Sequence, residues 1–171
     1  MDIEKTLMVV NELVADAVIK DFALGGAIAA IFYTEPIDTQ DVDIFVQVID
    51  TGINLAILSP IYDYMRARGY NIEAEHIFIE GFPVQFLPAF NALTDEAVTE
   101  ALEVELQTVK TRIMRPEHLV AIMLDTGRLK DYLRIDLFLR SEVVDRAKLQ
   151  DIVERHELTQ KWSQNKYRFE Q

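Results

Sequence analysis

Two aspartates in a short alternating segment are the residues of this sequence best suited to hold a metal ion. Residues 41–49 carry apolar side chains at every second position, which is the period of a β-strand. Asp41 and Asp43 fall on the other face together, because residues i and i+2 of a strand point the same way. Paired carboxylates repel each other unless water or a cation separates them, and Mg²⁺ favours carboxylate oxygens together with substrate phosphates. The pair therefore predicts either a metal site or two acids on the solvent face of an edge strand.

A glycine pair, Gly25 and Gly26, could hold a phosphate. It lies between an apolar run that predicts a strand, residues 21–24, and a small apolar segment that predicts a buried helix, residues 27–33. Glycine lets the backbone approach a ligand closely, and N–H groups at a helix start favour phosphate. The alternative is a turn whose glycines serve only close packing.

A few basic residues gather in the second half of an otherwise acidic chain. The sequence has 29 Asp and Glu against 17 Lys and Arg, a net charge of −12. Arg128 and Lys130 lie close together, and Arg134 follows one helical turn after Lys130. Arginine suits bidentate contacts with phosphate, and lysine supplies a point charge. These residues either bind an anionic ligand or form a solvated helix face beside Asp131 and Asp136.

The order and spacing of these features resemble those of a known superfamily. Residues 24–27 (Leu-Gly-Gly-Ala) and 39–46 (Thr-Gln-Asp-Val-Asp-Ile-Phe-Val) resemble the signature of the DNA polymerase β-like nucleotidyltransferases. Residues 115–121 and 126–131 are similar to the helical region of minimal nucleotidyltransferases related to the abortive-infection type IV toxins. The resemblance covers roughly residues 20–140.

The resemblance implies a role for each matching residue. It implies that Asp41 and Asp43 bind a divalent metal, Mg²⁺ or Mn²⁺, and are the catalytic carboxylates. It also implies a nucleoside triphosphate (NTP) site; its expected residues are Gly25, Gly26, Thr39, Arg128 and Lys130.

Two positions depart from the pattern of the family. Gln85 occupies the place of a third carboxylate, and an amide can coordinate a metal but carries no charge and is a poor base. Glu73, Glu75 or Glu80 could substitute for it. Met123 stands where the toxin-like members have a lysine, and it is most simply a core residue.

The elements that must position these residues form a mixed α/β part followed by helices. Beyond the segments above, the expected elements are helices at 3–19 and 55–69, strands at 72–79, 82–87 and 108–114, a helix capped by Thr94, and helices at 117–125, 129–140 and 145–155 before a polar tail. We therefore expect an α+β fold in which a nucleotidyltransferase core, residues 1–115, is flanked by helices. A C-terminal helical region, residues 116–171, would pack on that core.

The composition excludes several other classes of protein. The absence of cysteine excludes disulfides and thiolate chemistry, and His76, His118 and His156 lack the spacing of a zinc site. No signal peptide or membrane-spanning run is present, so we expect a cytoplasmic protein with no membrane partner. The acidic charge opposes non-specific binding of nucleic acid.

Three functional hypotheses remain open at this point. The first is an enzyme that transfers a nucleoside monophosphate from an NTP to an unknown acceptor. The second is a catalytically degenerate protein of the same fold that binds a nucleotide or a protein partner, in a toxin–antitoxin pair or a regulatory role. The third is a structural domain whose carboxylates are merely solvated.

Overall fold

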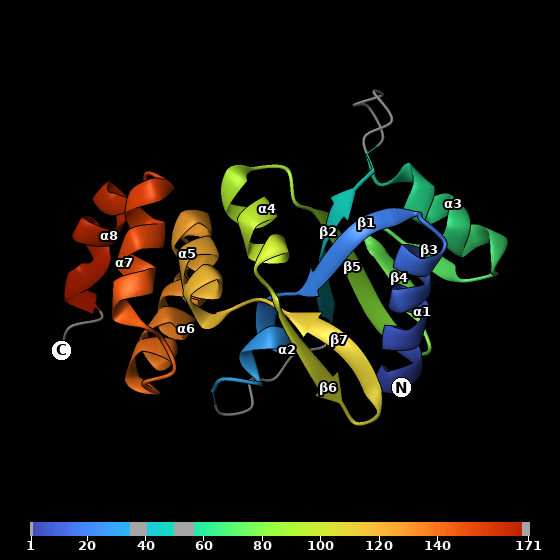
Figure 1. Ribbon diagram of the computed structural model, residues 1–171, viewed down its shortest axis with the longest axis horizontal. Helices are drawn as coiled ribbons and strands as arrows, with labels where there is room; N and C mark the ends of the chain where they lie inside the picture. The colour runs from blue at the N-terminus through green and yellow to red at the C-terminus, as the bar shows by residue number, and fades with distance from the viewer. Residues whose placement is uncertain (1, 35–40, 50–56, 169–171) are drawn as a thin grey trace.

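The computed structural model describes residues 2–34, 41–49 and 57–168. Figure 1 shows a sheet with helices around it and a group of helices beyond one end of the sheet. The strands are β1 (Ile19–Leu24), β2 (Val42–Val48), β3 (Asn71–Glu73), β4 (His76–Ile79), β5 (Phe82–Pro88), β6 (Leu102–Leu106) and β7 (Val109–Ile113). The helices are α1 (Ile3–Ala15), α2 (Gly26–Ala30), α3 (Ser59–Ala67), α4 (Ala92–Thr99), α5 (Pro116–Thr126), α6 (Leu129–Arg140), α7 (Arg146–Arg155) and α8 (Thr159–Asn165), followed by a 3-10 helix, Lys166–Arg168. The expected α+β class is confirmed.

The strands form one mixed sheet in the order β3-β4-β5-β2-β1-β7-β6. β2 lies at its centre, antiparallel to β1 and parallel to β5. β1 and β7 run parallel and are joined at a single residue pair, Leu24 with Ile113. Both edges of β2 are therefore paired with other strands, so Asp43 does not lie on an edge strand.

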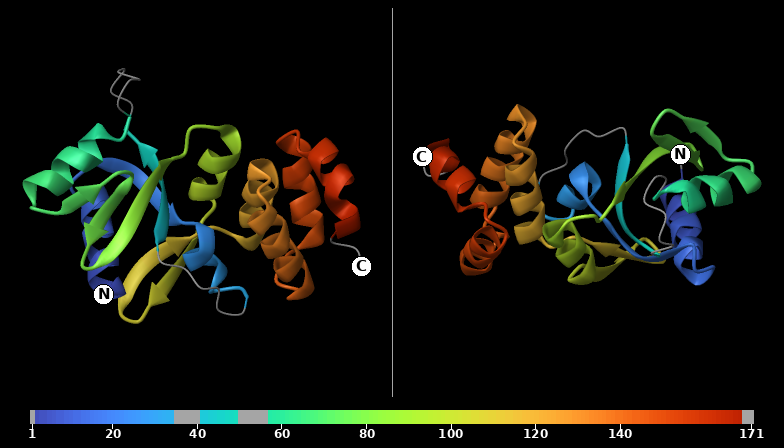
Figure 2. Two further views of the ribbon diagram at one scale, coloured as in Figure 1. Left: turned by 180° about the vertical axis from the view of Figure 1, so that it is seen from behind. Right: turned by 90° about the horizontal axis from the view of Figure 1, so that it is seen from above.

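The alternation of β2 decides which side chains enter the core. Val42, Ile44 and Val46 are fully buried, whereas Asp43 and Phe45 on the opposite face are half-buried. Figure 2 places α1 and α3 on one side of β2 and α2 on the other. The polar face of β2, which carries Asp43, is therefore the one that faces α2.

The C-terminal helices continue directly from the sheet. Only Met114 and Arg115 separate β7 from α5, where Pro116 occupies the first turn as the sequence predicts. Buried side chains of the two parts belong to one hydrophobic cluster, which includes Ala97 of α4 and Leu124 of α5. α5 lies beside α4 at the end of the sheet (Figure 1). The division of the chain at residue 115 stays a prediction.

Four local predictions are corrected by the structure. Residues 72–79 form two strands, β3 and β4, joined by a tight turn, and not one strand. Helix α4 is capped by Asn91, and Thr94 is the second partner of its capping box. The sequence predictions omitted β6, and the polar tail contains α8, which is anchored by buried Leu158.

The membrane prediction bears only on the helices that the structure describes. Within residues 2–34, 41–49 and 57–168, no helix is long and apolar enough to cross a membrane.

Candidate functional site

The glycine pair lies at the turn from β1 into α2 and is interlocked with β2. The Gly25 N–H donates a hydrogen bond of 2.9 Å to the backbone carbonyl of Asp43. Gly26 has a φ of +53°, in the left-handed region, and a Cβ there would lie 1.8 Å from Oδ2 of Asp43. A Cβ on Gly25 would lie 2.6 Å from the ring of Phe45. Both positions require glycine because the side chains of β2 approach the backbone so closely.

Asp43 is a half-buried carboxylate without a compensating partner in the described part of the chain. Its side chain makes no hydrogen bond or salt bridge to any residue described. Burial raises the pKa of Asp43 above its ordinary value, and the negative charge of Asp41 raises it further. A carboxylate in this condition is neutralised either by a proton or by a cation.

The basic residues of α6 act on the same carboxylate. The positive charges of Arg128, Arg134 and Lys130 lower the pKa of Asp43, opposing the effect of burial. The structure thus brings the start of α6 close to the carboxylates, although more than 80 residues separate them along the chain.

Arg128 has a structural bond as well as a position near Asp43. It is the N-cap residue of α6, and its Nε and Nη2 donate hydrogen bonds of 2.8 and 3.2 Å to Asp131. Asp131 is fully buried, so this pairing holds the first turn of the helix. Lys130 is exposed and Arg134 is half-buried, and neither makes a salt bridge to another described residue. Asp136, the other expected neighbour, pairs with Arg140.

Gln85 lies directly beside Asp43 across the β2–β5 pair. The two residues are partners in the parallel register, so their side chains share one face of the sheet. This is the place that the family resemblance gives to a third carboxylate. On the other side of Gln85, the register partner is His76 of β4.

The alternative carboxylates do not occupy that place. Glu73 lies on β3, three strand spacings or about 14 Å from Asp43. Glu75 falls in the turn between β3 and β4, and Glu80 in the turn between β4 and β5 near Tyr70. Among the described residues, the amide of Gln85 is therefore the side chain in register with Asp43 at this position. Thr39, the remaining predicted nucleotide contact, lies outside the described residues.

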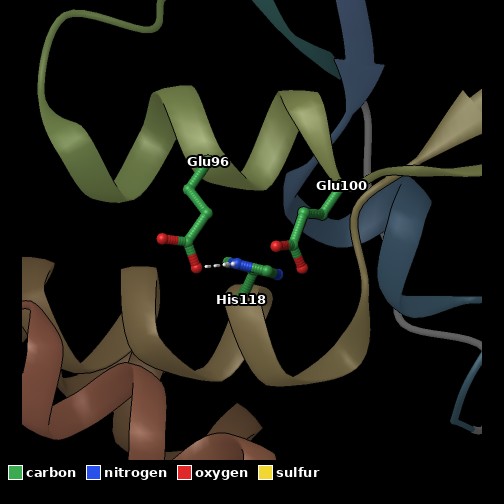
Figure 3. A group of neighbouring side chains, drawn as sticks. All are labelled: Glu96, Glu100 and His118. Atoms are coloured by element: carbon green, nitrogen blue, oxygen red, sulfur yellow. Dashed lines mark hydrogen bonds and ion pairs between the residues drawn. The ribbon is translucent and has the colours of Figure 1, made fainter.

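A second polar cluster was not predicted from the sequence. Glu96 of α4 accepts hydrogen bonds of 3.0 Å from His118 of α5 and from His156, which follows α7. Arg155 donates to both carboxylate oxygens of Glu96, at 2.6 and 2.9 Å. The bond from Arg155 and those from the two histidines lower the pKa of Glu96 to about 2, despite its burial. Figure 3 shows Glu96 and Glu100, one helical turn apart, both pointing toward His118.

The sequence pattern could have indicated the two glutamates of this second cluster but not its histidines. Glu96 and Glu100 are spaced by four residues within a helix, so their common face could have been recognised. The histidines lie 22 and 60 residues away from Glu96 on other helices, and no sequence spacing connects them.

Solved structures of nucleotidyltransferase-like proteins share this fold at low sequence identity. An antigenic nucleotidyltransferase-like protein from Paracoccidioides brasiliensis matches with a TM-score of 0.57 and 15% identity, over 97% of this chain and 91% of that chain. The antibiotic-resistance factor ANT(2'')-Ia in solution matches with a TM-score of 0.50 and 14% identity, over 96% of this chain and 97% of that chain. A crystal structure of ANT(2'')-Ia in complex with adenylyl-2''-tobramycin gives a TM-score of 0.50 and 14% identity, over 90% and 98% of the two chains.

At 14–15% identity, these matches show the fold alone. The chain has a nucleotidyltransferase fold, a sheet flanked by helices and followed by C-terminal helices. No protein-family model matches the sequence, and no curated protein matches it. The resemblance to the abortive-infection toxins stays a prediction, because the three structures above are not described as members of that family.

Proposed function

We propose that the protein binds a nucleoside triphosphate with Mg²⁺ or Mn²⁺ and transfers its nucleoside monophosphate to an acceptor. One observation carries the proposal. The half-buried carboxylate of Asp43, unpaired among the described residues, lies against the Gly26 turn and within the field of the basic residues of α6. Removing a carboxylate from water without giving it a partner costs free energy, and binding of a metal ion offsets that cost.

Each predicted residue has a defined part in this proposal. Asp41 and Asp43 hold the metal, and the carbonyl oxygen of Gln85 is a further ligand on the same face. Gly25 and Gly26 hold the turn from β1 into α2 against Phe45 and Asp43, so a triphosphate at this turn would lie beside the carboxylate of Asp43.

The basic part of the proposed site comes from the helical region. Lys130 and the exposed side of Arg128 neutralise the charge of the triphosphate, and Thr39 completes the nucleotide site. The core, residues 1–115, and the helical region, residues 116–171, would thus form one site between them.

The proposed chemistry is an attack by an acceptor nucleophile on the α-phosphorus of the nucleotide, with pyrophosphate leaving. The divalent ion would supply neutralisation of the charge that develops on the phosphate oxygens. The protein's own part is to hold the triphosphate in line with the acceptor and to surround it with the charges of α6.

The choice of acceptor class follows from charge and from the fold neighbours. The net charge of −12 repels long polyanions, so a small molecule or a protein is favoured over nucleic acid. The complex of ANT(2'')-Ia with adenylyl-2''-tobramycin carries an adenylyl group on a small molecule, which supports a small acceptor here.

A second candidate function is nucleotide binding without transfer. It is favoured by Gln85, because its neutral amide is in register with Asp43 where a third carboxylate would help to hold metal ions and activate the acceptor. In this case the protein would act by binding a partner protein, for example in a toxin–antitoxin pair or as a regulatory subunit.

Titration calorimetry tests the proposed site. Purified protein is titrated with ATP, GTP, CTP and UTP, with and without Mg²⁺ or Mn²⁺. We expect metal-dependent binding that the Asp41→Ala/Asp43→Ala double variant loses. The matched control is Glu103→Ala/Glu105→Ala, which removes two exposed carboxylates with the same spacing on edge strand β6. Equal binding by wild type and the aspartate variant would refute the site.

A gain-of-function variant separates the two candidates. Transfer is followed as pyrophosphate release with small-molecule and protein acceptors, for wild type and Gln85→Glu. Transfer by the wild type supports the enzyme. The binding protein is supported if the wild type binds nucleotide in the presence of metal but transfers nothing, and only Gln85→Glu releases pyrophosphate.

A further inference from the structure

A buried imidazole between α4 and α5 has one nitrogen without a partner. The side chain of His118 is 1% exposed, and one of its ring nitrogens, Nε2, lies 3.0 Å from Oε1 of Glu96. The other nitrogen, Nδ1, is buried and has no hydrogen-bond partner among the residues described. A buried polar nitrogen left in this state is costly, so the site is incomplete without a further group.

Two carboxylates approach the same ring. One ligand atom from each of Glu96, Glu100 and His118 can be chosen so that all three lie within 4.8 Å of one another. Figure 3 shows the carboxylates coming from one face of α4 and pointing toward His118, which rises from α5. Because Glu96 is bonded to Nε2, the unpartnered Nδ1 of His118 and the carboxylate of Glu100 are the groups left to bind a cation.

The bond to Glu96 determines which nitrogen of a neutral His118 is free to bind a metal. In the neutral ring, an Nε2–H that donates to Glu96 leaves the lone pair on Nδ1, which has no partner among the described residues. Histidine ligands in metal sites commonly donate their other N–H to a carboxylate, which fixes the ring and raises its basicity. Arg155 donates hydrogen bonds to both oxygens of the same carboxylate and so keeps it in place.

We propose that Glu100 and His118, with His118 positioned by Glu96, bind Zn²⁺ or a chemically similar divalent transition-metal ion. Glu100 is exposed, so water can reach the ion and complete a four-coordinate shell. The ion would join α4, which belongs to the sheet part, to α5, the first helix of the C-terminal part. This site does not depend on the proposed nucleotide site, because none of its residues is shared with it.

Calorimetric titration of the full chain with Zn²⁺ tests the proposal. It is performed on the Asp41→Ala/Asp43→Ala variant, so that ions at those aspartates do not contribute. We expect one saturable site, whose affinity falls at least tenfold in Glu100→Gln and in His118→Gln. Glu105→Gln, an exposed carboxylate on β6, is the control and should bind as the parent does.

Two further measurements distinguish the loss of a metal ligand from the loss of folded structure. Because His118 is buried, the circular dichroism spectrum of His118→Gln is compared with that of the parent, to show that the variant is folded. If the two spectra differ, the comparison of Zn²⁺ affinity rests on Glu100→Gln, which changes an exposed residue. In the parent, the ¹⁵N shift of His118 Nδ1 should move on addition of Zn²⁺, and the melting temperature should rise. Unchanged affinity in Glu100→Gln, or no saturable binding by the parent, would overturn the proposal.

Discussion

The side chain of Asp43 fills the space in which a side chain of residue 26 would lie. Each residue therefore limits the side chain that is possible at the other position. Because the backbone of Gly26 is left-handed, a Cβ at this position would point toward the carboxylate of Asp43. It would lie too close to the carboxylate for any side chain to fit. The glycine turn and strand β2 are therefore one interlocked unit. A change at Gly26 acts on Asp43 directly, without any change in the charge of the site.

Replacement of Gly26 by alanine should separate backbone strain from this contact. Gly69 also has a positive φ, +82°, but a Cβ there would meet nothing within 4 Å. Gly69→Ala should therefore cost about 1 kcal/mol of unfolding free energy, from backbone strain alone. Gly26→Ala should cost at least about 1 kcal/mol more, because Asp43 must also move. Urea unfolding of the two variants measures the difference, and equal losses would show that Asp43 moves aside freely.

At the residue scale, the sequence predicted positions within an element better than contacts between elements. The alternation of β2 was enough to place Asp43 on the face opposite buried Val42 and Ile44, whereas Asp41 immediately precedes the strand in the structure. The bonds between Glu96 and its histidines could not be predicted, because they depend on how separate helices pack.

The first turn of α6 combines a structural bond with the charges that act on Asp43. Asp131 is fully buried and receives the Nε, the Nη2 and the backbone N–H of Arg128. Lys130, in the same turn, is exposed and makes no such bond to a described residue. Removal of the Arg128 side chain should therefore affect stability, whereas removal of the Lys130 side chain should affect NTP binding.

We expect Arg128→Ala to lower the unfolding free energy by about 2 kcal/mol, because it removes the charged partner of a buried carboxylate. Lys130→Ala should change it by less than about 0.5 kcal/mol, as at most exposed sites, yet weaken NTP binding several-fold. Urea unfolding and calorimetric titration of both variants measure these effects. Loss of stability in Lys130→Ala, or none in Arg128→Ala, would contradict this division of roles.

At the element scale, two errors had signals that could be recognised in the sequence. Ile72 and Ile77 are an odd number of residues apart, so no single strand places both on one face, yet they are cross-strand partners here. The turn between them lacks glycine, proline and asparagine, so it carries no ordinary turn signal. β6 alternates Leu, Glu, Val, Glu and Leu, which is an ordinary strand pattern.

Across the whole molecule, Glu96 is the point at which three helices meet. It lies on α4 and bonds to His118 of α5 and to Arg155 at the end of α7. The sequence predicted that the C-terminal helices pack against the sheet part but could not identify the residues that hold them. A charged group shared by both parts makes their docking sensitive to acid.

The acid sensitivity of Glu96→Gln should differ from that of the wild type. The pKa of Glu96 is lowered from 4.5 to about 2 in the folded protein, so its carboxylate stabilises the fold above pH 4.5. This contribution is lost as the pH falls from 4.5 toward 2. We expect Glu96→Gln to be less stable than wild type by about 2 kcal/mol at pH 7, and the gap to narrow at pH 3.

Urea unfolding in the presence of EDTA, at pH 7 and pH 3, measures that gap without bound metal. Fluorescence of Trp162, the single tryptophan of the sequence, reports on α8 and so on the helical region. Glu105→Gln is the control, because its carboxylate is exposed on β6. A gap that stays constant between the two pH values would show that Glu96 does not contribute through its charge.

The pairing of Gln85 with Asp43 also has a consequence in the genetic code. Both codons for glutamine become codons for glutamate by one change of the first base. Because Gln85 already shares a face with Asp43 through the β2–β5 register, that single base change would place a third acid beside the pair with no change in side-chain length. The charge of the site can therefore be gained or lost in one mutational step while the fold around it stays the same.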